Sequence, residues 1–323
     1  MTWQVEEGIG EQRAVSIENG RVVAARLHWP GSLGAGAVIE ARLVHRSKGS
    51  ARGTAITSNG REVLLDRLPK EASRGSIVNV AITRSAIAER GRTKRAQGRI
   101  TGDTPTPAPS LAEQLRMSGY DPRIVHRFDG DADWEALFSA AWRGQVDYDG
   151  GTLLVAETPG MSVIDVDGPA TAANARAAAK AVGEAVRLFD MGGSIGVDFP
   201  SLPAKPDRRI VDDTLAEGLN GWPHERTAMN GFGFVQIVAR LERPSLFQRI
   251  YHARVAAAAR LLLRRGEHLD GPGLTLLTCH PALRAHLRAD WLEELSRRTG
   301  RAHRIETDPG LGIESGQAQI VTV

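Results

Sequence analysis

Three aspartates occupy positions at which carboxylates could hold a divalent cation. Asp165 and Asp167 stand two residues apart at the end of a predicted strand, so their side chains share one face. Asp198 ends the next predicted strand, after an intervening helix. A β–α–β crossover makes such strands parallel neighbours or near neighbours, which places Asp165 and Asp198 at one rim of a sheet. Because Mg²⁺ prefers oxygen ligands, the pattern predicts a magnesium site, with Mn²⁺ as an alternative ion.

The chemistry expected of such a site is phosphodiester hydrolysis. Bound Mg²⁺ polarises a phosphodiester and lowers the pKa of an attacking water. Asp165 and Asp198 are the predicted ligands, and Asp167 is predicted to assist or tune the metal. A structural alternative stays open, in which these residues cap helices or solubilise strand ends. Asp167 precedes Gly168-Pro169 and would make a natural N-cap.

The elements that must position these aspartates follow an α/β pattern from residue 150 onward. Strands are predicted at 152–156, 161–166, 194–199 and 234–239. Helices are predicted at 170–189, within 206–220 and at 247–265. A strand, a helix and a strand are predicted at 274–278, 283–298 and 302–306. The helix at 247–265 carries five arginines, and RNA contact and a solvated face are equally open interpretations.

A second region, 37–100, is predicted to form a small barrel. Five short strands are expected, at 37–45, 53–57, 62–65, 76–83 and 98–101, which fits an OB-type fold. The segment holds 14 Lys and Arg against 5 Asp and Glu, a net charge of +9, whereas the whole chain carries +3. It contains no Phe, Trp or Tyr. Nucleic-acid binding there is therefore expected to be phosphate-directed and sensitive to salt.

The remaining segments connect these two regions. Residues 10–30 predict a β-hairpin that turns at Asn19-Gly20. The proline-rich stretch 101–110 (TGDTPTPAPS) predicts a linker, and Ser110 is expected to cap a short helix at 111–117. A strand is predicted at 124–128 and an amphipathic helix at 134–142.

Composition restricts the class of protein. Cys279 is the one cysteine among 323 residues, which excludes an intramolecular disulfide and a zinc site built from several cysteines of one chain. The N-terminus lacks the apolar stretch of a signal peptide, and no apolar run approaches the roughly 18–20 residues of a membrane span. We therefore expect a cytoplasmic protein with no membrane association.

Three segments together resemble the ribonuclease E/G family. The segment 150–167 (GGTLLVAETPGMSVIDVD) is similar to the family's Gly-Gly strand followed by its Ile-Asp-hydrophobic-Asn strand. The segment 187–199 (RLFDMGGSIGVDF) resembles the Arg-Leu-Arg-Asp…Gly-Gly…Ile-Asp-Phe motif. NGFGF at 230–234 and RPSL at 243–246 resemble the Arg-Phe-Gly…Arg-Pro-Ser-Leu segment. Order and spacing agree over about 150–250, and more weakly outside it.

The resemblance implies an α/β fold with an RNase H-like and DNase I-like catalytic core, an inserted OB-type barrel and a small α/β C-terminal domain. The implied parts are 1–36 and 121–149 (RNase H-like), 37–101 (barrel), 102–120 (linker and helix), 150–250 (DNase I-like) and 251–323 (C-terminal). It implies a Mg²⁺-dependent endoribonuclease that cleaves single-stranded RNA, with Asp165 and Asp198 as metal ligands. The predicted RNA-binding residues are Arg92, Lys94, Arg95, Arg240 and Arg243.

The sequence departs from the family at several points. Asp167 stands where the family has Asn, and the added charge could strengthen metal binding or disturb the approach of phosphate. Gly231 stands where the family usually has Arg. The interval 101–121 has no room for the family's 5′-monophosphate sensor. A homodimer stays open as a partner interaction, but one joined by a cysteine zinc link is not expected. A non-catalytic RNA-binding relative is the alternative hypothesis.

Overall fold

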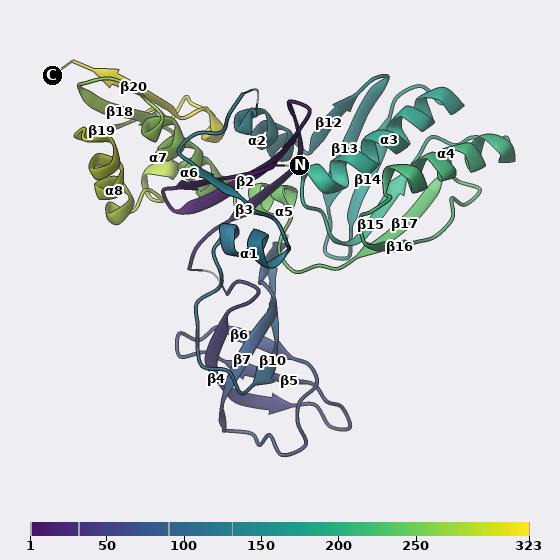
Figure 1. The fold of residues 1–323 in the computed structure, drawn as a ribbon, viewed down its shortest axis with the longest axis horizontal. Coiled ribbons are helices and arrows are strands. Elements are labelled where there is room, and N and C mark those ends of the chain that lie inside the picture. The colour runs from purple at the N-terminus through teal and green to yellow at the C-terminus, as the bar shows by residue number, and fades with distance from the viewer. Residues whose placement is uncertain (1, 32, 90, 131, 323) are drawn as a thin grey trace.

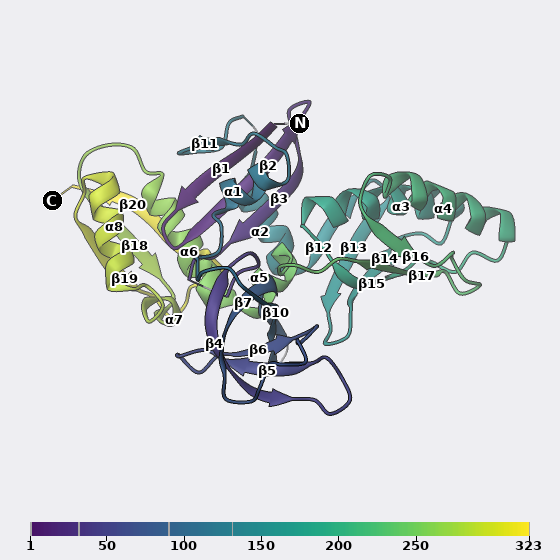
Figure 2. The ribbon, with the colours of Figure 1, turned by 60° about the horizontal axis from the view of Figure 1, so that its bottom comes forward.

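The chain forms a branched molecule of mixed α/β structure around a central sheet. The computed structural model describes residues 2–31, 33–89, 91–130 and 132–322. Figures 1 and 2 show a closed barrel below the central sheet, a six-stranded sheet to the right and the C-terminal elements to the left. No helix in the described part of the chain is long and apolar enough to cross a membrane.

The central sheet contains the N-terminus of the chain. Its strands in spatial order are β11 (Arg123–Val125), β1 (Thr2–Gly8), β2 (Glu11–Glu18) and β3 (Arg21–His28). β11 is parallel to β1, and the other pairs are antiparallel. The predicted hairpin turn is confirmed, since Asn19 and Gly20 have φ values of 51° and 76°. Helix α1 (Leu111–Met117) packs beside the sheet and begins with the predicted Ser110 cap.

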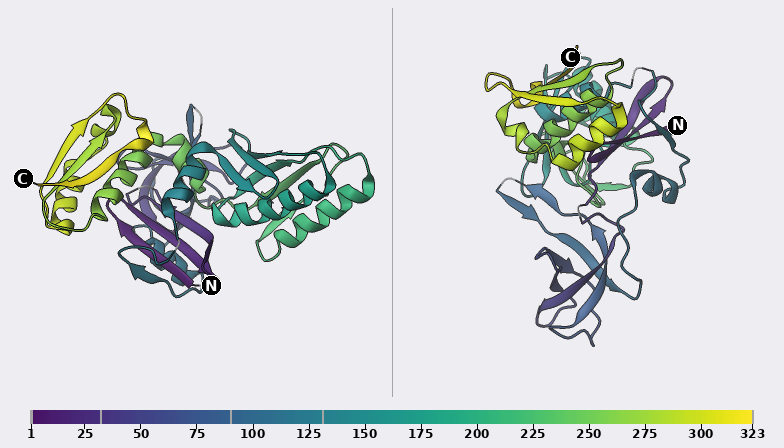
Figure 3. Two further views of the ribbon diagram at one scale, coloured as in Figure 1. Left: turned by 90° about the horizontal axis from the view of Figure 1, so that it is seen from above. Right: turned by 90° about the vertical axis from the view of Figure 1, so that its left-hand side faces the viewer.

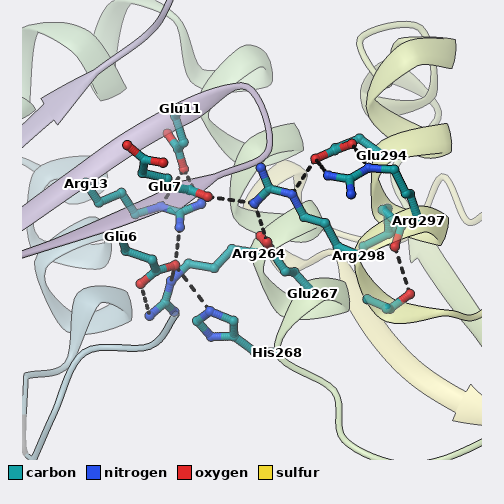
Figure 4. A network of polar contacts seen from close by, with 12 residues as sticks. Glu6, Glu7, Glu11, Arg13, Arg264, Glu267, His268, Glu294, Arg297 and Arg298 are labelled. Atoms are coloured by element: carbon teal, nitrogen blue, oxygen red, sulfur yellow. Dashed lines mark hydrogen bonds and ion pairs between the residues drawn. The ribbon is translucent and has the colours of Figure 1, made fainter. Parts of the chain in front are cut away.

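Strand β1 was missed by the sequence analysis because both of its faces are buried. Trp3 and Val5 pack in one apolar cluster, while Gln4 and Glu6 on the other face are also buried. Alternation of apolar and polar residues identifies a strand that has one solvated face, but here the polar positions mark a second buried contact. Glu6 belongs to a polar network with helix α6 (Arg254–Glu267), which Figure 4 shows.

The predicted barrel at 37–100 is confirmed as a closed five-stranded barrel with its own apolar core. Its strands are β4 (Val38–Arg46), β5 (Gly53–Ile56), β6 (Glu62–Leu65), β7 (Ile77–Arg84) and β10 (Ala96–Thr101), in the closed order β10-β6-β5-β4-β7. β6 and β10 pair in parallel, and the other neighbours are antiparallel. A hairpin that was not predicted, β8 (Ile87–Glu89) and β9 (Arg92–Lys94), leaves the barrel and packs on helix α5 (Leu246–His252).

The six-stranded sheet carries the aspartates. Its strands in spatial order are β12 (Gln145–Tyr148), β13 (Gly151–Glu157), β14 (Ser162–Asp167), β15 (Gly193–Asp198), β17 (Phe234–Ala239) and β16 (His224–Arg226). Helices α3 (Ala172–Leu188) and α4 (Lys205–Gly218) lie along one face of this sheet (Figure 3). The alanine-rich side of α3 packs on the buried face of the strands.

The C-terminal region differs from the sequence prediction in its helices. The single helix predicted at 247–265 is interrupted at Ala253, whose φ of −131° is not helical, and it forms α5 and α6. The single helix predicted at 283–298 is divided into α7 (Pro281–Arg284) and α8 (Ala289–Thr299). A small C-terminal sheet has the strand order β19 (His303–Thr307), β18 (Leu274–Cys279) and β20 (Gln317–Val321). Outside this region, helix α2 (Trp134–Arg143) packs in the main apolar core.

The arginines of α5 and α6 are structural. Arg249 and Arg260 lie over the Trp29 ring, at 5.0 and 4.1 Å from its centroid, and Arg254 lies 4.9 Å from the Trp142 centroid. Burial and, second to it, the charge of the neighbouring Arg260 lower the pKa of Arg249 to about 10. All three guanidinium groups stack on aromatic rings. Arg249 and Arg260 are partly buried, so a solvated face is wrong for them, whereas Arg254 is exposed. RNA contact by these helices stays a prediction.

Candidate metal centre

Asp165 and Asp198 lie side by side on two adjacent strands. β14 and β15 pair in parallel, and their register makes Asp165 the direct partner of Asp198. Neighbouring strands are about 4.8 Å apart, and side chains at paired positions project from the same face of a sheet. The crossover through α3 therefore brings the two carboxylates to one rim, as the spacing in the sequence predicts.

The alternation along each strand decides which face carries the aspartates. Ile164 and Val197 are completely buried and pack in the same apolar core as helix α3. Asp165 and Asp198, one residue further along each strand, are exposed on the opposite face. Figure 3 shows α3 and α4 on the other side of the sheet. The carboxylates are therefore accessible to a ligand the size of a nucleic-acid strand.

Asp167 lies on the same face of the sheet as Asp165, two residues further along β14. Its cross-strand partner is Thr152, whose hydroxyl donates a hydrogen bond of 3.1 Å to Asp147. Asp167 does not cap the following helix, because Thr171 is the N-cap of α3 and accepts a hydrogen bond from the Asn174 backbone. The interpretation of Asp167 as a helix cap was therefore wrong. Its carboxylate adds a third exposed negative charge near the paired aspartates.

No basic group in the described part of the chain compensates these charges. The carboxylates of Asp165, Asp167 and Asp198 accept no hydrogen bond and form no ion pair with any described residue. By contrast, Asp190 is held by Arg243 at 2.6 Å, and Asp212 forms a bidentate pair with Arg226. Free carboxylates at adjacent positions repel each other, and a cation from outside would relieve that repulsion.

The donor set fits a magnesium ion. Mg²⁺ is commonly held by one or two carboxylates and completes its shell with water and substrate phosphate. Asp165 and Asp198 supply two such carboxylates with free oxygens, and the open face leaves room for the remaining ligands. Within residues 2–31, 33–89, 91–130 and 132–322, no group of three or more His, Cys, Asp or Glu side chains is placed to hold a metal by itself.

Two predicted RNA-binding residues, Arg240 and Arg243, lie away from this rim. β15 and β17 are antiparallel, so Gly193 pairs with Ala239 at one end of the sheet and Asp198 pairs with Phe234 at the other. Five residue steps along a strand span roughly 17 Å. Arg243 is also tied to Asp190, which raises its pKa against the opposing effect of burial. Arg243 therefore has a structural contact in the fold, and its role in RNA binding stays a prediction.

The predicted barrel residues are partly available. Arg92 pairs with Glu89 and also donates a hydrogen bond of 3.3 Å to the carbonyl of Pro159, so it joins the barrel hairpin to the β13–β14 turn. Arg95 pairs with Glu62 at 2.7 Å, and its side chain is half exposed. Lys94 is partly exposed and has no ion-pair partner among the described residues.

A groove on the barrel joins the predicted Arg95 to basic residues that the sequence analysis did not select. It has a volume of about 580 Å³, and Arg52, Arg84 and His45 line it together with Arg95. The buried Nε of Arg84 has no hydrogen-bond partner among the described residues, and burial lowers the pKa of this guanidinium. The signal in the sequence was the basic composition of 37–100, but composition does not reveal which arginines share one groove.

A second hollow, of about 630 Å³, lies beside Glu135 and Arg265 near the C-terminal elements. Its charged residues already pair with each other, since Arg265 and Glu135 are 2.7 Å apart.

The comparison with known proteins adds no identification: no protein-family model matches the chain, and no curated protein is significantly similar to it. The functional interpretation therefore depends on the geometry of the aspartates and the barrel.

Proposed function

We propose that the protein is a Mg²⁺-dependent endoribonuclease of the ribonuclease E/G type that cleaves single-stranded RNA. The observation that carries the proposal is the parallel register of Asp165 and Asp198, two exposed carboxylates with no cation partner in the described part of the chain. Two exposed carboxylates side by side offer oxygen ligands to a hard cation, so their position on an open face supports a functional role.

The architecture supports the same proposal. The central sheet β11-β1-β2-β3 is interrupted in sequence by the barrel, in agreement with a split RNase H-like subdomain into which an OB-type barrel is inserted. In this proposal, the six-stranded sheet with α3 and α4 would correspond to the DNase I-like subdomain. The barrel groove presents arginines without aromatic side chains, which suits contact with the phosphates of an RNA strand.

Each part of the site would have a distinct role in the reaction. When bound, Mg²⁺ would polarise the phosphodiester and lower the pKa of the attacking water. Asp165 and Asp198 would hold the ion and fix its position, because both extend from the ends of paired strands. The open face would admit an unpaired RNA strand, and the barrel arginines would bind its backbone at a distance from the cleaved bond.

The test is cleavage of a labelled single-stranded RNA in Mg²⁺, compared with the same reaction in EDTA. Asp165→Asn and Asp198→Asn each remove one ligand charge, and we expect the rate to fall on the order of a thousandfold, or about 4 kcal/mol in the barrier. Asp213→Asn is the matched control, because Asp213 is an exposed aspartate on α4 with no partner among the described residues. Equal rates in both variants and wild type would contradict the proposal.

The second candidate is an RNA-binding relative without catalytic activity. Two observations favour it: Gly231 leaves no arginine at the rim where the family carries one, and Asp167 adds negative charge where RNA phosphates would approach. For this candidate, RNA binds with a strong dependence on salt, but the RNA stays intact in Mg²⁺. The same cleavage assay therefore distinguishes the two candidates.

A further inference from the structure

The loop before β17 holds an aromatic ring in solvent. The side chain of Phe232 is 82% exposed, more than any other large apolar residue in the described part of the chain. An exposed phenyl ring forgoes the favourable free energy that burial in an apolar core would give. An isolated exposed apolar residue is common on protein surfaces, so the argument depends on how this loop is built and on what lies beside it.

The loop is rigidly closed by its own polar groups. The side-chain oxygen of Asn230 accepts hydrogen bonds from the backbone amides of Phe232 and Phe234, at 2.9 and 3.0 Å. The Gly233 amide donates to the Asn230 carbonyl at 3.2 Å. The Asn230 backbone amide also donates to the Phe234 carbonyl at 3.1 Å, so four hydrogen bonds fix the backbone of a five-residue turn with Phe232 at its tip. A backbone that is fixed before binding has less conformational entropy to lose when a ligand stacks on the ring.

The same loop is attached to the metal rim. The Phe199 amide donates to the Gly233 carbonyl at 3.2 Å, and Phe199 directly follows Asp198. Gly233 has a φ of +92°, and a Cβ at this position would lie 2.4 Å from the Phe199 carbonyl oxygen. Only glycine permits this approach. Phe234 is the cross-strand partner of Asp198, and Phe232 is at most about 7 Å further along the backbone.

The neighbouring aromatic residue behaves differently, which makes Phe232 distinctive. A Cβ at Gly196 would lie 2.6 Å from Cζ of Phe234, so the Phe234 ring covers the sheet at Gly196. Phe234 is accordingly only partly exposed. The barrel, which would bind the RNA backbone, has no aromatic residue at all within 37–100. Any stacking on a base near the cleaved bond must therefore come from outside the barrel.

We infer that Phe232 stacks on the base of a nucleotide beside the phosphate held at Asp165 and Asp198, and that it positions that phosphate for cleavage. This inference rests on the proposed nuclease function. A nucleobase is the occupant that the surroundings favour, because it is flat and uncharged, and its phosphate would lie at the cation between the two carboxylates. Stacking on an aromatic ring tolerates all four bases, so Phe232 fixes the position of the strand without selecting a sequence.

The experiment measures KM and kcat for wild type and Phe232→Ala, on one intact RNA and on a series with a single abasic nucleotide placed at successive positions around the cleaved bond. We expect Phe232→Ala to raise KM about tenfold on intact RNA. At one position the abasic nucleotide raises KM of wild type to the same extent and has no further effect on the variant. Phe232→Trp restores wild-type KM, and Phe232→Leu does not.

Met117→Ala is the matched control, since Met117 is 77% exposed on α1, in a different part of the molecule. An unchanged KM in Phe232→Ala, or an abasic penalty of equal size in both proteins, would overturn the inference while the nuclease proposal stands. A change in sedimentation of Phe232→Ala with unchanged KM would also overturn it, because the ring would then belong to a protein contact. If wild type cleaves no RNA in Mg²⁺ beyond the EDTA reaction, the proposed function fails and the inference fails with it.

Discussion

Two groups of carboxylates in this protein have opposite surroundings. Glu6 and Glu11 are buried at the junction of the central sheet and helix α6, and their charges are matched by Arg13, Arg264 and His268 (Figure 4). Asp165 and Asp198 lie exposed at the rim of the six-stranded sheet, with no cation among the described residues. The first group is neutralised by the fold itself, whereas no described basic residue neutralises the second.

The difference shows how acidic residues for structure and for function can be separated. Burial alone raises the pKa of Glu6, but the hydrogen bond to His268 and the charges of Arg13 and Arg264 outweigh burial and lower this pKa to about 2. Such a carboxylate is fully committed to its partners. The rim aspartates have no partner among the described residues, so their replacement is expected to change chemistry and leave stability nearly unaltered.

The largest effect expected on stability is that of Glu6→Gln. This substitution removes the charge that Arg13 and Arg264 contact, and it leaves buried cations that are incompletely paired. We expect the free energy of unfolding to fall by about 3 kcal/mol. Urea denaturation followed by circular dichroism measures it, and Glu18→Gln, at an exposed position of β2, is the control. A larger loss for Asp198→Asn than for Glu6→Gln would reverse the comparison between the two groups.

His28 provides the opposite test, because it is a partly buried imidazole that lies near positive charges instead of negative ones. Burial, together with the charges of Arg249 and Arg243, lowers the pKa of His28 to about 4. The unfolded chain takes up this proton near pH 6.5, but the folded protein does not. The contribution of His28 to the free energy of unfolding is therefore fully present above about pH 6.5 and is lost as the pH falls towards 4. Because His28 is partly exposed, solvent screening limits this loss to about 2 kcal/mol.

His28→Asn should remove this part of the pH dependence. Thermal unfolding of both proteins between pH 7 and pH 4 measures the difference, and the two curves should diverge below about pH 6.5. Parallel curves throughout this range would show that His28 titrates normally in the folded protein.

A smaller effect is expected at Asp167. Asn at this position removes one negative charge from the rim and keeps the shape of the side chain. We expect KM for RNA to fall about threefold with little change in kcat, because a phosphate strand meets less repulsion. Steady-state cleavage at fixed Mg²⁺ measures this change. A loss of rate as large as that of Asp198→Asn would instead make Asp167 a metal ligand.

The smallest effect is expected when the 5′ end of the substrate is varied. A site that binds a 5′-phosphate needs basic groups or helix amides that are not already paired, just as a cation needs unpaired carboxylates. In α1 the Ser110 side chain accepts a hydrogen bond from the Glu113 amide, and the Glu113 carboxylate accepts one from the Ser110 amide, so the helix start is occupied. RNAs with 5′-triphosphate, 5′-monophosphate and 5′-hydroxyl ends should be cut at similar rates. A tenfold preference for the monophosphate would locate a sensor elsewhere.

The sequence by itself determined the local elements around the site. Alternation along 161–166 and 194–199 identified two strands with an aspartate, Asp165 or Asp198, one residue before the end. The helix between them required a crossover that pairs these strands in parallel. The Ser110 cap and the Asn19-Gly20 turn were equally local, because neighbouring residues decide both conformations.

The tertiary structure decided which of these residues meet and which charges stay free. Arg243 looked available for RNA in the sequence, yet Asp190, 53 positions earlier, holds it. Arg249 and Arg260 both lie over the ring of Trp29, which directly follows β3 and is more than 200 residues away in the sequence. Local patterns record the conformation of a segment. Whether a charge is compensated depends on packing between distant segments, so only the folded chain shows that Asp165 and Asp198 have no partner in the part of the chain that the structure describes.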